Sequence, residues 1–175
     1  MARLAVGRSA LDIGCAQLPN PFLTNPRVVG LDLDDMPLRP PYTRHVVGDA
    51  FDIDALLAGE AFDAVLMGSI IEHVERPYDL LRAVRRHVAD GGRLILATPN
   101  PLGVPQAVAE LLTWRRFFYS PEHTYAFAPR WVWRLLERTG FRPVRTVGCG
   151  ASLYGVWFPA PTGLSYTVIY VAVGA

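Results

Sequence analysis

The segment Ser9-Ala10-Leu11-Asp12-Ile13-Gly14-Cys15-Ala16 is followed at a short interval by Val28-Val29-Gly30-Leu31-Asp32, and together these two stretches indicate the fold class. Both stretches are apolar runs with an acidic residue at or near their end, as in strands buried within a parallel sheet. In doubly wound α/β sheets, ligands bind outside the carboxyl ends of the strands, and an acid there can accept hydrogen bonds from ribose hydroxyls. A glycine turn also allows the backbone to approach a ligand closely. We therefore predict that a nucleoside-type cofactor binds at this edge.

The bulk composition favours a single domain covering residues 1–175, with a hydrophobic fraction of 51% that is ample for a core. The net charge of +1 gives no indication of nucleic-acid binding. No apolar run approaches the roughly 20 residues that a membrane span requires, and the amino-terminal residues lack the apolar core of an export signal. We therefore expect a cytoplasmic protein that binds neither nucleic acid nor membrane.

Two cysteines, Cys15 and Cys149, are too few for a disulfide framework, and no metal-ligand spacing surrounds them, so no metal site is predicted. Cys15 follows the glycine turn and could be read as a nucleophile. No base is identifiable beside it, so a packing role is favoured.

The hydrophobic pattern predicts seven strands and several helices around one mostly parallel sheet. Strands are expected at 9–14, 27–33, 45–48, 62–67, 93–97, 143–147 and 166–173. Helices are expected at 77–89, 104–116 and 129–139, and a short helix or turn is expected at 52–58. The last strand is expected to be antiparallel, and the Gly/Pro-rich residues 148–165 are expected to form a long hairpin-like loop.

Two of the connections between parallel strands are too rich in proline to form regular helices. Residues 17–27 contain Pro19, Pro21 and Pro26, and residues 34–42 contain three further prolines. Parallel strands need a crossover connection, which is usually helical. We therefore predict a Rossmann-like α/β three-layer sandwich whose helices are depleted on one face.

Several short motifs, in order, resemble those of the class I S-adenosylmethionine-dependent methyltransferases. The motifs are Leu11–Cys15, Val28–Asp32, Gly48-Asp49-Ala50, Phe62–Val65, Glu72-His73-Val74, Gly91–Asn100, Ser120–Pro129 and Leu135–Phe141. Each motif is weak alone, but their order along nearly the whole chain is specific. The resemblance implies a short form of that family with degenerate first and second crossover helices.

The resemblance also implies roles for the residues at the strand ends, with S-adenosylmethionine as the cofactor. The turn from Asp12 to Gly14 would face the methionine portion of this methyl donor, and Asp32 would bind the ribose diol. Asp49 and the backbone of Ala50 would contact the adenine. The sulfonium side would be lined by residues at the end of the fourth strand, Met67 and Ser69.

On the acceptor side, His73 is the leading candidate for a catalytic base, and a structural role for this histidine is about equally favoured. His123 and Tyr125 are candidate substrate-binding residues, with anchoring of their loop as the alternative. The aromatic segment from Trp114 to Tyr119 is interpreted as packing or contact surface rather than as a base-stacking site. Of Trp131 and Trp133, one is expected in the core and one at an interface or pocket rim.

The chain also departs from the family pattern. Ala16 and Leu18 stand where the first turn usually has further glycines, and only eight residues precede Ser9, where a helix that covers the pocket is usual. The missing leading helix predicts an open site, and together with the two proline-broken connections it predicts a thinly covered apolar sheet face. Such a face favours a homodimer or a partner subunit.

We therefore predict methyl transfer from S-adenosylmethionine to a small-molecule or glycan-like acceptor. The alternative is a non-catalytic, methyltransferase-like subunit that stabilises or activates a partner protein. A dinucleotide-dependent oxidoreductase is a weaker alternative, because no G-x-G-x-x-G motif opens a helix after the first strand.

Overall fold

The structure, a computed structural model, describes residues 1–103, 107, 111–112, 122–153 and 156–175. The helix predicted over 104–116 lies mostly outside the described residues, and the aromatic segment from Trp114 to Tyr119 lies entirely outside them. Among the described residues, no helix is long and apolar enough to cross a membrane.

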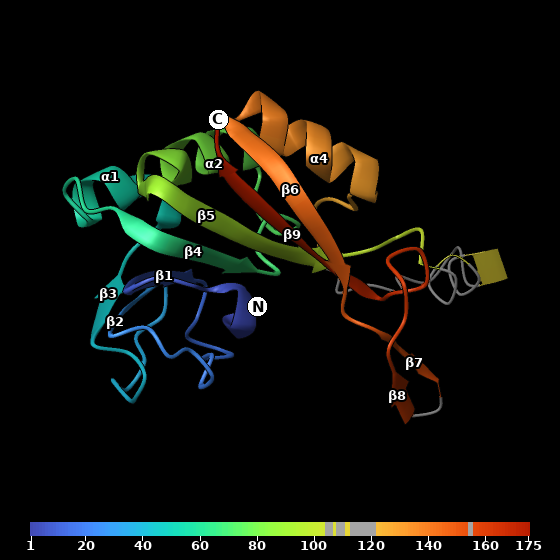
Figure 1. Ribbon diagram of the computed structural model, residues 1–175, viewed down its shortest axis with the longest axis horizontal. Helices are drawn as coiled ribbons and strands as arrows, with labels where there is room; N and C mark the ends of the chain where they lie inside the picture. Colours follow the sequence, from blue (N-terminus) through green and yellow to red (C-terminus); the bar gives the residue numbers. More distant parts are fainter. Residues whose placement is uncertain (104–106, 108–110, 113–121, 154–155) are drawn as a thin grey trace.

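A seven-stranded sheet in the order β3-β2-β1-β4-β5-β9-β6 forms the centre of the molecule (Figure 1). Its strands are β1 (Ser9–Ile13), β2 (Arg27–Asp32), β3 (Arg44–Val47), β4 (Phe62–Gly68), β5 (Val88–Pro99), β6 (Phe141–Gly148) and β9 (Thr167–Gly174). The pairs among β1 to β5 are parallel, whereas β9 runs antiparallel to both β5 and β6. The predicted mostly parallel sheet with an antiparallel last strand is confirmed.

Within the predicted loop 148–165, β7 (Ala151–Leu153) and β8 (Val156–Phe158) pair as a separate two-stranded sheet. This small hairpin projects from one end of the main sheet (Figure 1).

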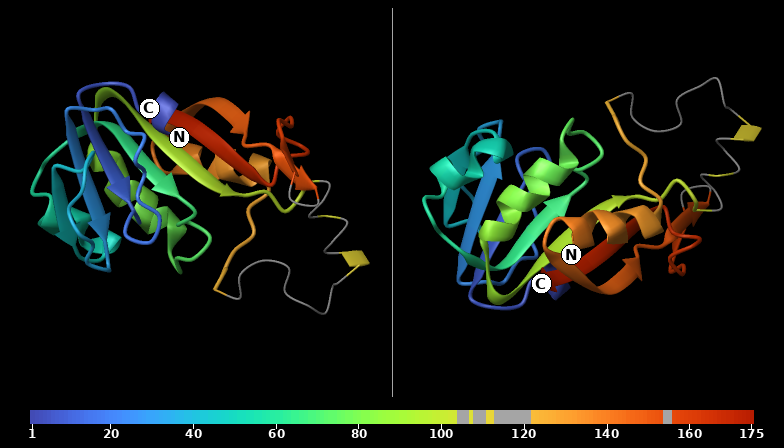
Figure 2. Two further views of the ribbon diagram at one scale, coloured as in Figure 1. Left: turned by 90° about the horizontal axis from the view of Figure 1, so that it is seen from below. Right: turned by 90° about the horizontal axis from the view of Figure 1, so that it is seen from above.

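The helices α1 (Ile53–Leu56), α2 (Pro77–Arg86) and α4 (Pro129–Arg138) pack on one face of the sheet, as Figures 1 and 2 show. Short 3-10 turns, η1 (Ala2–Leu4) and η2 (Ala50–Asp52), precede β1 and α1. The helices bury Leu80, Leu81, Val132 and Leu136 in one core with strand residues such as Leu11. Burial of this apolar surface is the main stabilising contribution on this side.

The opposite face has no α-helix among the described residues, which confirms the predicted depletion. The strand residues there are nevertheless buried, and the expectation of a thinly covered face is wrong in this respect. Strand residues such as Val28 and Leu66 pack under Leu23, Met36 and Tyr42 from the proline-rich connections. Prolines exclude a helix, but they do not prevent a loop from burying apolar side chains.

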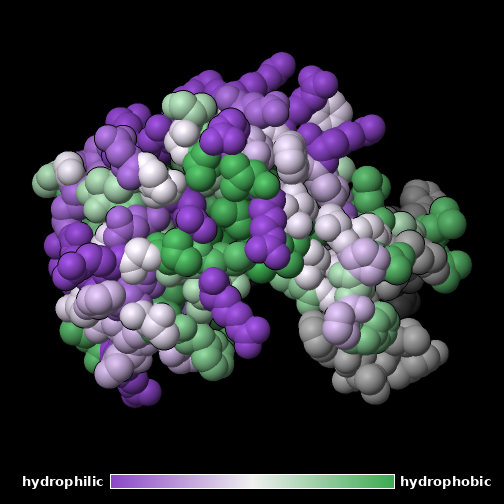
Figure 3. All heavy atoms as spheres, viewed as in Figure 1, coloured by the Kyte–Doolittle hydropathy of each residue, from purple (hydrophilic) through white to green (hydrophobic). Residues whose placement is uncertain are grey.

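Some large apolar side chains of the proline-rich connections remain exposed. Leu18 is 87% exposed, Phe22 76% and Leu38 56%. Figure 3, which shows the molecule from the direction of Figure 1, shows apolar side chains gathered near the middle of the molecule, with polar side chains around them.

The predicted end of the helix over 77–89 is wrong, because α2 ends at Arg86 and Val88 already belongs to β5. His87 lies between them and is buried. Its Nδ1 lies 2.7 Å from the Glu60 carbonyl oxygen and its Nε2 lies 3.1 Å from Asp54 Oδ1. These polar partners explain how the imidazole is accommodated in the core.

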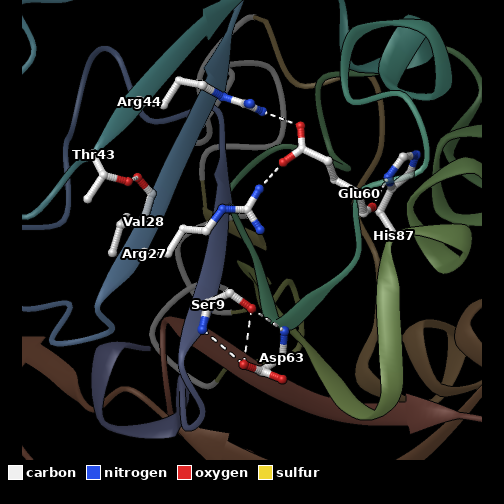
Figure 4. Close-up of polar contacts among 8 residues, drawn as sticks. All are labelled: Ser9, Arg27, Val28, Thr43, Arg44, Glu60, Asp63 and His87. Atoms are coloured by element: carbon white, nitrogen blue, oxygen red, sulfur yellow. Dashed lines mark hydrogen bonds and ion pairs between the residues drawn. The ribbon is translucent and has the colours of Figure 1, made fainter.

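Polar contacts also tie the strands together at the amino end of the sheet (Figure 4). The carboxylate of Glu60 accepts hydrogen bonds from Arg27 and Arg44, on β2 and β3. The carboxylate of Asp63 accepts hydrogen bonds from the backbone and hydroxyl of Ser9, at 2.9 and 3.0 Å, which hold β1 against β4. These contacts lie at the amino ends of the strands, and the ligand is expected at the other, carboxyl ends.

The prediction for the two tryptophans of α4 is wrong, because neither is in the core. Trp131 is 55% exposed and Trp133 is 38% exposed. The indole N–H of Trp133 donates to Thr146 Oγ1 at 2.9 Å, which holds this side chain across β6. The core positions of the helix are occupied by Val132, Leu135 and Leu136.

Candidate active site

The carboxyl ends of β1, β2 and β4 meet at one edge, since Ile13 pairs with both Leu31 and Met67. β1 is followed by Gly14, whose φ of +73° is a conformation that favours glycine. Its N–H donates to the Leu31 carbonyl at 2.8 Å, and an added Cβ would lie 2.5 Å from Ile70 Cδ1. The turn therefore favours glycine chiefly for its backbone conformation, since the Ile70 side chain could shift to admit a Cβ.

Asp32, at the end of β2, holds the backbone around it with both carboxylate oxygens. Oδ2 accepts a hydrogen bond from the Ala16 N–H at 2.7 Å, and Oδ1 accepts from the Asp34 N–H at 3.1 Å. A carboxylate has about four acceptor positions, so two remain for a ligand. The half-buried side chain at a strand end suits the predicted ribose contact.

Asp12 is buried beneath the turn and is joined to a tyrosine that the sequence did not single out. The Tyr42 hydroxyl donates to Asp12 Oδ2 at 2.5 Å and accepts from the Asn20 N–H at 2.8 Å. Burial raises the pKa of Asp12 to about 6, against the lowering effect of the hydrogen bond from Tyr42. Both proline-rich connections are thus linked to β1 at the position of Asp12.

Asp49 and Ala50 lie at the next strand end. The Gly48 N–H donates to the Asp32 carbonyl at 2.8 Å, which places this segment beside Asp32. Asp49 Oδ1 accepts from the Phe51 N–H at 2.9 Å and so caps η2, while Ala50 packs partly against the core. The position fits the predicted adenine contact, and the cap shows that Asp49 also has a structural role.

The two residues predicted to line the sulfonium side differ in their placement. The Met67 side chain is fully buried in the helix-side core, so that only its backbone can face a ligand. Ser69 adopts a φ of +55°, which is uncommon for a residue other than glycine, and its N–H donates to the Ala97 carbonyl at 2.9 Å. Such strained backbone at a strand end is often found at functional sites.

Cys15 is fully buried, and an added Cβ on Gly30 would lie 2.7 Å from its sulfur. Burial raises the pKa of Cys15 to about 12, with a further rise from the nearby Asp12 and Asp32 carboxylates. A thiol in this environment is not a nucleophile at neutral pH, which agrees with the predicted packing role.

The structure brings the predicted acceptor-side residues together from segments 50 positions apart. The Glu72 carbonyl accepts from the Thr124 N–H at 2.7 Å and from the Tyr125 N–H at 3.1 Å. The rings of His73 and His123 then meet edge to face, with centroids 4.6 Å apart. The Tyr125 hydroxyl donates to the Glu75 carbonyl at 3.1 Å, so this side chain anchors the loop.

Glu72, beside the predicted acceptor-side residue His73, is a buried acid that the sequence did not single out. It is 1% exposed, and its Oε2 accepts a hydrogen bond from Thr98 Oγ1 at 3.1 Å. Burial raises the pKa of the Glu72 carboxyl. The available signal was an acid beside His73 immediately after two isoleucines, since buried acids seldom occur without a specific partner.

A parallel sheet with an acid and a glycine turn at its carboxyl edge defines a Rossmann-like α/β protein with a nucleotide-type site. A family model described as a methyltransferase domain matches residues 1–146. The chain therefore belongs to the methyltransferase domain family, within the class I S-adenosylmethionine-dependent methyltransferases. The predicted family is confirmed.

Among curated proteins, the chain is 30% identical over 158 residues to a ubiquinone biosynthesis O-methyltransferase of a Ruegeria species. It is 32% identical over 158 residues to the protein of the same description from Ruegeria pomeroyi. Both matches cover 81% of this chain and 63% of the relative, so the chain spans less than two thirds of the length of these proteins.

Among solved structures, the fold is similar to 1,6-didemethyltoxoflavin-N1-methyltransferase of Burkholderia thailandensis, with a TM-score of 0.68 and 19% identity, covering 99% of this chain and 74% of that one. It is also similar to a methyltransferase from Archaeoglobus fulgidus, with a TM-score of 0.63 and 17% identity, covering 94% of this chain and 85% of that one. These likenesses confirm the predicted Rossmann-like fold.

Proposed function

We propose that this chain binds S-adenosylmethionine at the carboxyl edge of β1, β2 and β4 and transfers its methyl group to a small-molecule acceptor. The observation that carries the proposal is the clustering of Gly14, Asp32 and Ser69 at one sheet edge, in a chain of the methyltransferase family. In this proposal, Asp32 accepts from the ribose hydroxyls and Asp49 contacts the adenine. The turn from Asp12 to Gly14 and the backbone at Met67 face the methionine portion.

The acceptor lies beside His73, His123 and Tyr125 in this proposal. Methyl transfer from a sulfonium is a displacement in which alignment of donor and acceptor supplies much of the rate. An oxygen acceptor that reacts as an anion must also lose a proton, and in this proposal His73 accepts it. The curated O-methyltransferase relatives support a hydroxyl acceptor.

The test is calorimetric titration of the purified chain with S-adenosylhomocysteine, the demethylated product of the donor. We expect one molecule bound per chain with micromolar affinity. Incubation with donor and a panel of phenols and sugars then identifies the acceptor class by mass, as a gain of one methyl group. A folded chain that binds neither donor nor product, alone or with a partner, would contradict the proposal.

A second candidate function, a methyltransferase-like subunit that activates a partner, is supported by the exposed apolar side chains of the proline-rich connections. Leu18 and Phe22 are large, apolar and more than three quarters exposed, and such groups favour association. One structure similar in fold is a complex of the Haloferax volcanii Trm112 methyltransferase activator with a putative methyltransferase; the match has a TM-score of 0.64 and 15% identity, and covers 96% of this chain and 82% of that one.

Association predicts that sedimentation velocity shows a species heavier than one chain of 19.3 kDa, either alone or with a co-purified partner. The double substitution Leu18→Ser and Phe22→Ser should return the chain to a monomer, because it removes two apolar contacts without touching the core. A wild-type chain that remains monomeric over a wide concentration range and co-purifies with no partner would contradict association. Donor binding seen only in the presence of a partner would favour the subunit function over the independent enzyme.

A further inference from the structure

We propose that Glu72, His73 and His123 bind a divalent first-row transition-metal cation on the acceptor side of the site. Each of the three residues offers one ligand atom, and these atoms all lie within 4.8 Å of one another. Ligands held by one ion at about 2.1 Å lie roughly 3 to 4 Å apart, so the three atoms would move slightly closer together on binding. Two imidazoles and one carboxylate are a donor set that suits cations such as Zn²⁺ and Co²⁺.

A second observation, the state of the Glu72 carboxylate, independently indicates a ligand. Oε2 accepts from Thr98, but the other oxygen, Oε1, is buried and has no hydrogen-bond partner among the described residues. A buried carboxylate oxygen without a partner is costly, because the free energy lost on leaving water is not recovered. A bound cation would supply that missing interaction.

The backbone holds the three side chains at this position before any ion binds. The two hydrogen bonds from Thr124 and Tyr125 to the Glu72 carbonyl fix the segment carrying His123 against the one carrying His73. The His73 N–H donates to the Ile70 carbonyl at 2.9 Å, and Thr98 orients the carboxylate. Such outer contacts orient metal ligands and contribute to their affinity.

The site would contribute directly to the proposed methyl transfer, and this part of the inference rests on the proposed function. Three protein ligands leave positions open for an oxygen of the acceptor. A cation there lowers the pKa of a bound hydroxyl, so that its proton leaves to water. The oxygen anion then forms a bond to the methyl carbon as the carbon–sulfur bond breaks, and the sulfonium becomes a neutral thioether. With the cation bound, His73 acts as a ligand and the cation replaces it as the group that promotes deprotonation.

The cation site is tested by titrating chelator-treated protein with Zn²⁺ and with Co²⁺, following heat and, for Co²⁺, the visible absorption bands that nitrogen ligands produce. We expect one ion per chain. Glu72→Gln, which keeps an acceptor for Thr98, and His123→Ala should each weaken binding at least tenfold. Glu75→Gln, which removes an equal charge three residues further on, should bind as the wild type does.

Two outcomes would overturn the cation site: no saturable binding by folded wild-type protein, or binding that neither Glu72→Gln nor His123→Ala weakens. Circular dichroism identifies a variant that fails to fold, and the other variant then decides. Titration of the same samples with S-adenosylhomocysteine separates this inference from the proposed function. Product binding without cation binding contradicts the cation site alone, whereas cation binding without product binding contradicts the donor site alone.

Discussion

The substitution Asp32→Ala is expected to weaken binding of S-adenosylhomocysteine by at least about 100-fold, measured by calorimetry at neutral pH. In the proposed complex the carboxylate accepts hydrogen bonds from both ribose hydroxyls, and each such bond to a charged group contributes about 1.5–3 kcal/mol. The substitution also removes the acceptor for the Ala16 N–H, which now fixes the turn after β1. Both effects act in the same direction, since a loosened turn would have to be ordered again on binding.

Asp34→Ala is the matched control, because Asp34 is exposed on the same loop and contacts Asp32 only through its backbone N–H. It should bind the product with wild-type affinity. The less severe Asp32→Asn variant keeps one acceptor oxygen and should lie between the wild type and Asp32→Ala. If Asp32→Ala bound as tightly as the wild type, the ribose would have to be held elsewhere along this edge.

The sheet could be predicted from the sequence because its signals are local. Apolar runs such as 62–67 and 93–97 are buried on both faces, and the strands that they predict are present as β4 and β5. Helix ends were less predictable. The apolar face of α2 continues in sequence through Val88, so periodicity alone did not reveal that the chain leaves the helix at Arg86.

The site was predictable only where a residue's role depends on its own strand. Gly14 and Asp32 stand at strand ends, and the structure places them together as their pattern suggested. Tyr42 and Glu72 were missed because their roles depend on partners far away in the chain. Tyr42 reaches Asp12 across 30 positions, and Glu72 meets the backbone of residue 124. Neither contact produces a periodic pattern of residues from which it could be predicted.

The same long-range contacts explain why the prolines did not leave the sheet bare. A proline-rich connection cannot form the usual crossover helix, and the pattern correctly predicted its absence. The pattern could not show that Met36 and Tyr42 would reach back over the strands to bury Val28. The coverage is therefore made by individual side chains of loops, and the hydroxyl of Tyr42 makes it dependent on Asp12.

Burial of the Asp12 carboxyl beneath Tyr42 leads to the second prediction. The Asp12→Asn variant is expected to be more stable than the wild type at pH 8, by up to about 3 kcal/mol in urea unfolding. In the folded chain the pKa of Asp12 is raised from 3.8 to about 6, chiefly by burial. A pKa raised by about two units corresponds to a loss of about 3 kcal/mol of folding stability when the carboxyl is ionised, at about 1.4 kcal/mol for each unit. The folded state thus holds the proton more tightly than the unfolded state does between pH 4 and pH 6.

The sign follows from this difference in proton binding. The wild type should lose stability from this group as the pH rises from about 4 to about 6, and above pH 6 the full cost of a buried carboxylate remains. The side-chain amide that replaces the carboxyl carries no charge and its oxygen can still accept from Tyr42, so the advantage of the variant should disappear below pH 4. Asp34→Asn, at an exposed position, should follow the wild type throughout. An Asp12→Asn variant that is less stable than the wild type at pH 8 would show that the ionised carboxylate is stabilised by its surroundings.

Tyr42→Phe then tests whether the tyrosine is what makes the buried carboxylate tolerable. The hydrogen bond from Tyr42 lowers the pKa of Asp12, so its removal should raise that pKa further and extend the loss of stability to higher pH. In the Asp12→Asn background the same substitution should cost less, because the hydrogen bond lost is then to a neutral group. A non-additive result of this kind would show that the loop and the strand are coupled through one charge. The Tyr42–Asp12 pair would then support the donor turn from below, beside the hydrogen bond from the Ala16 N–H to Asp32.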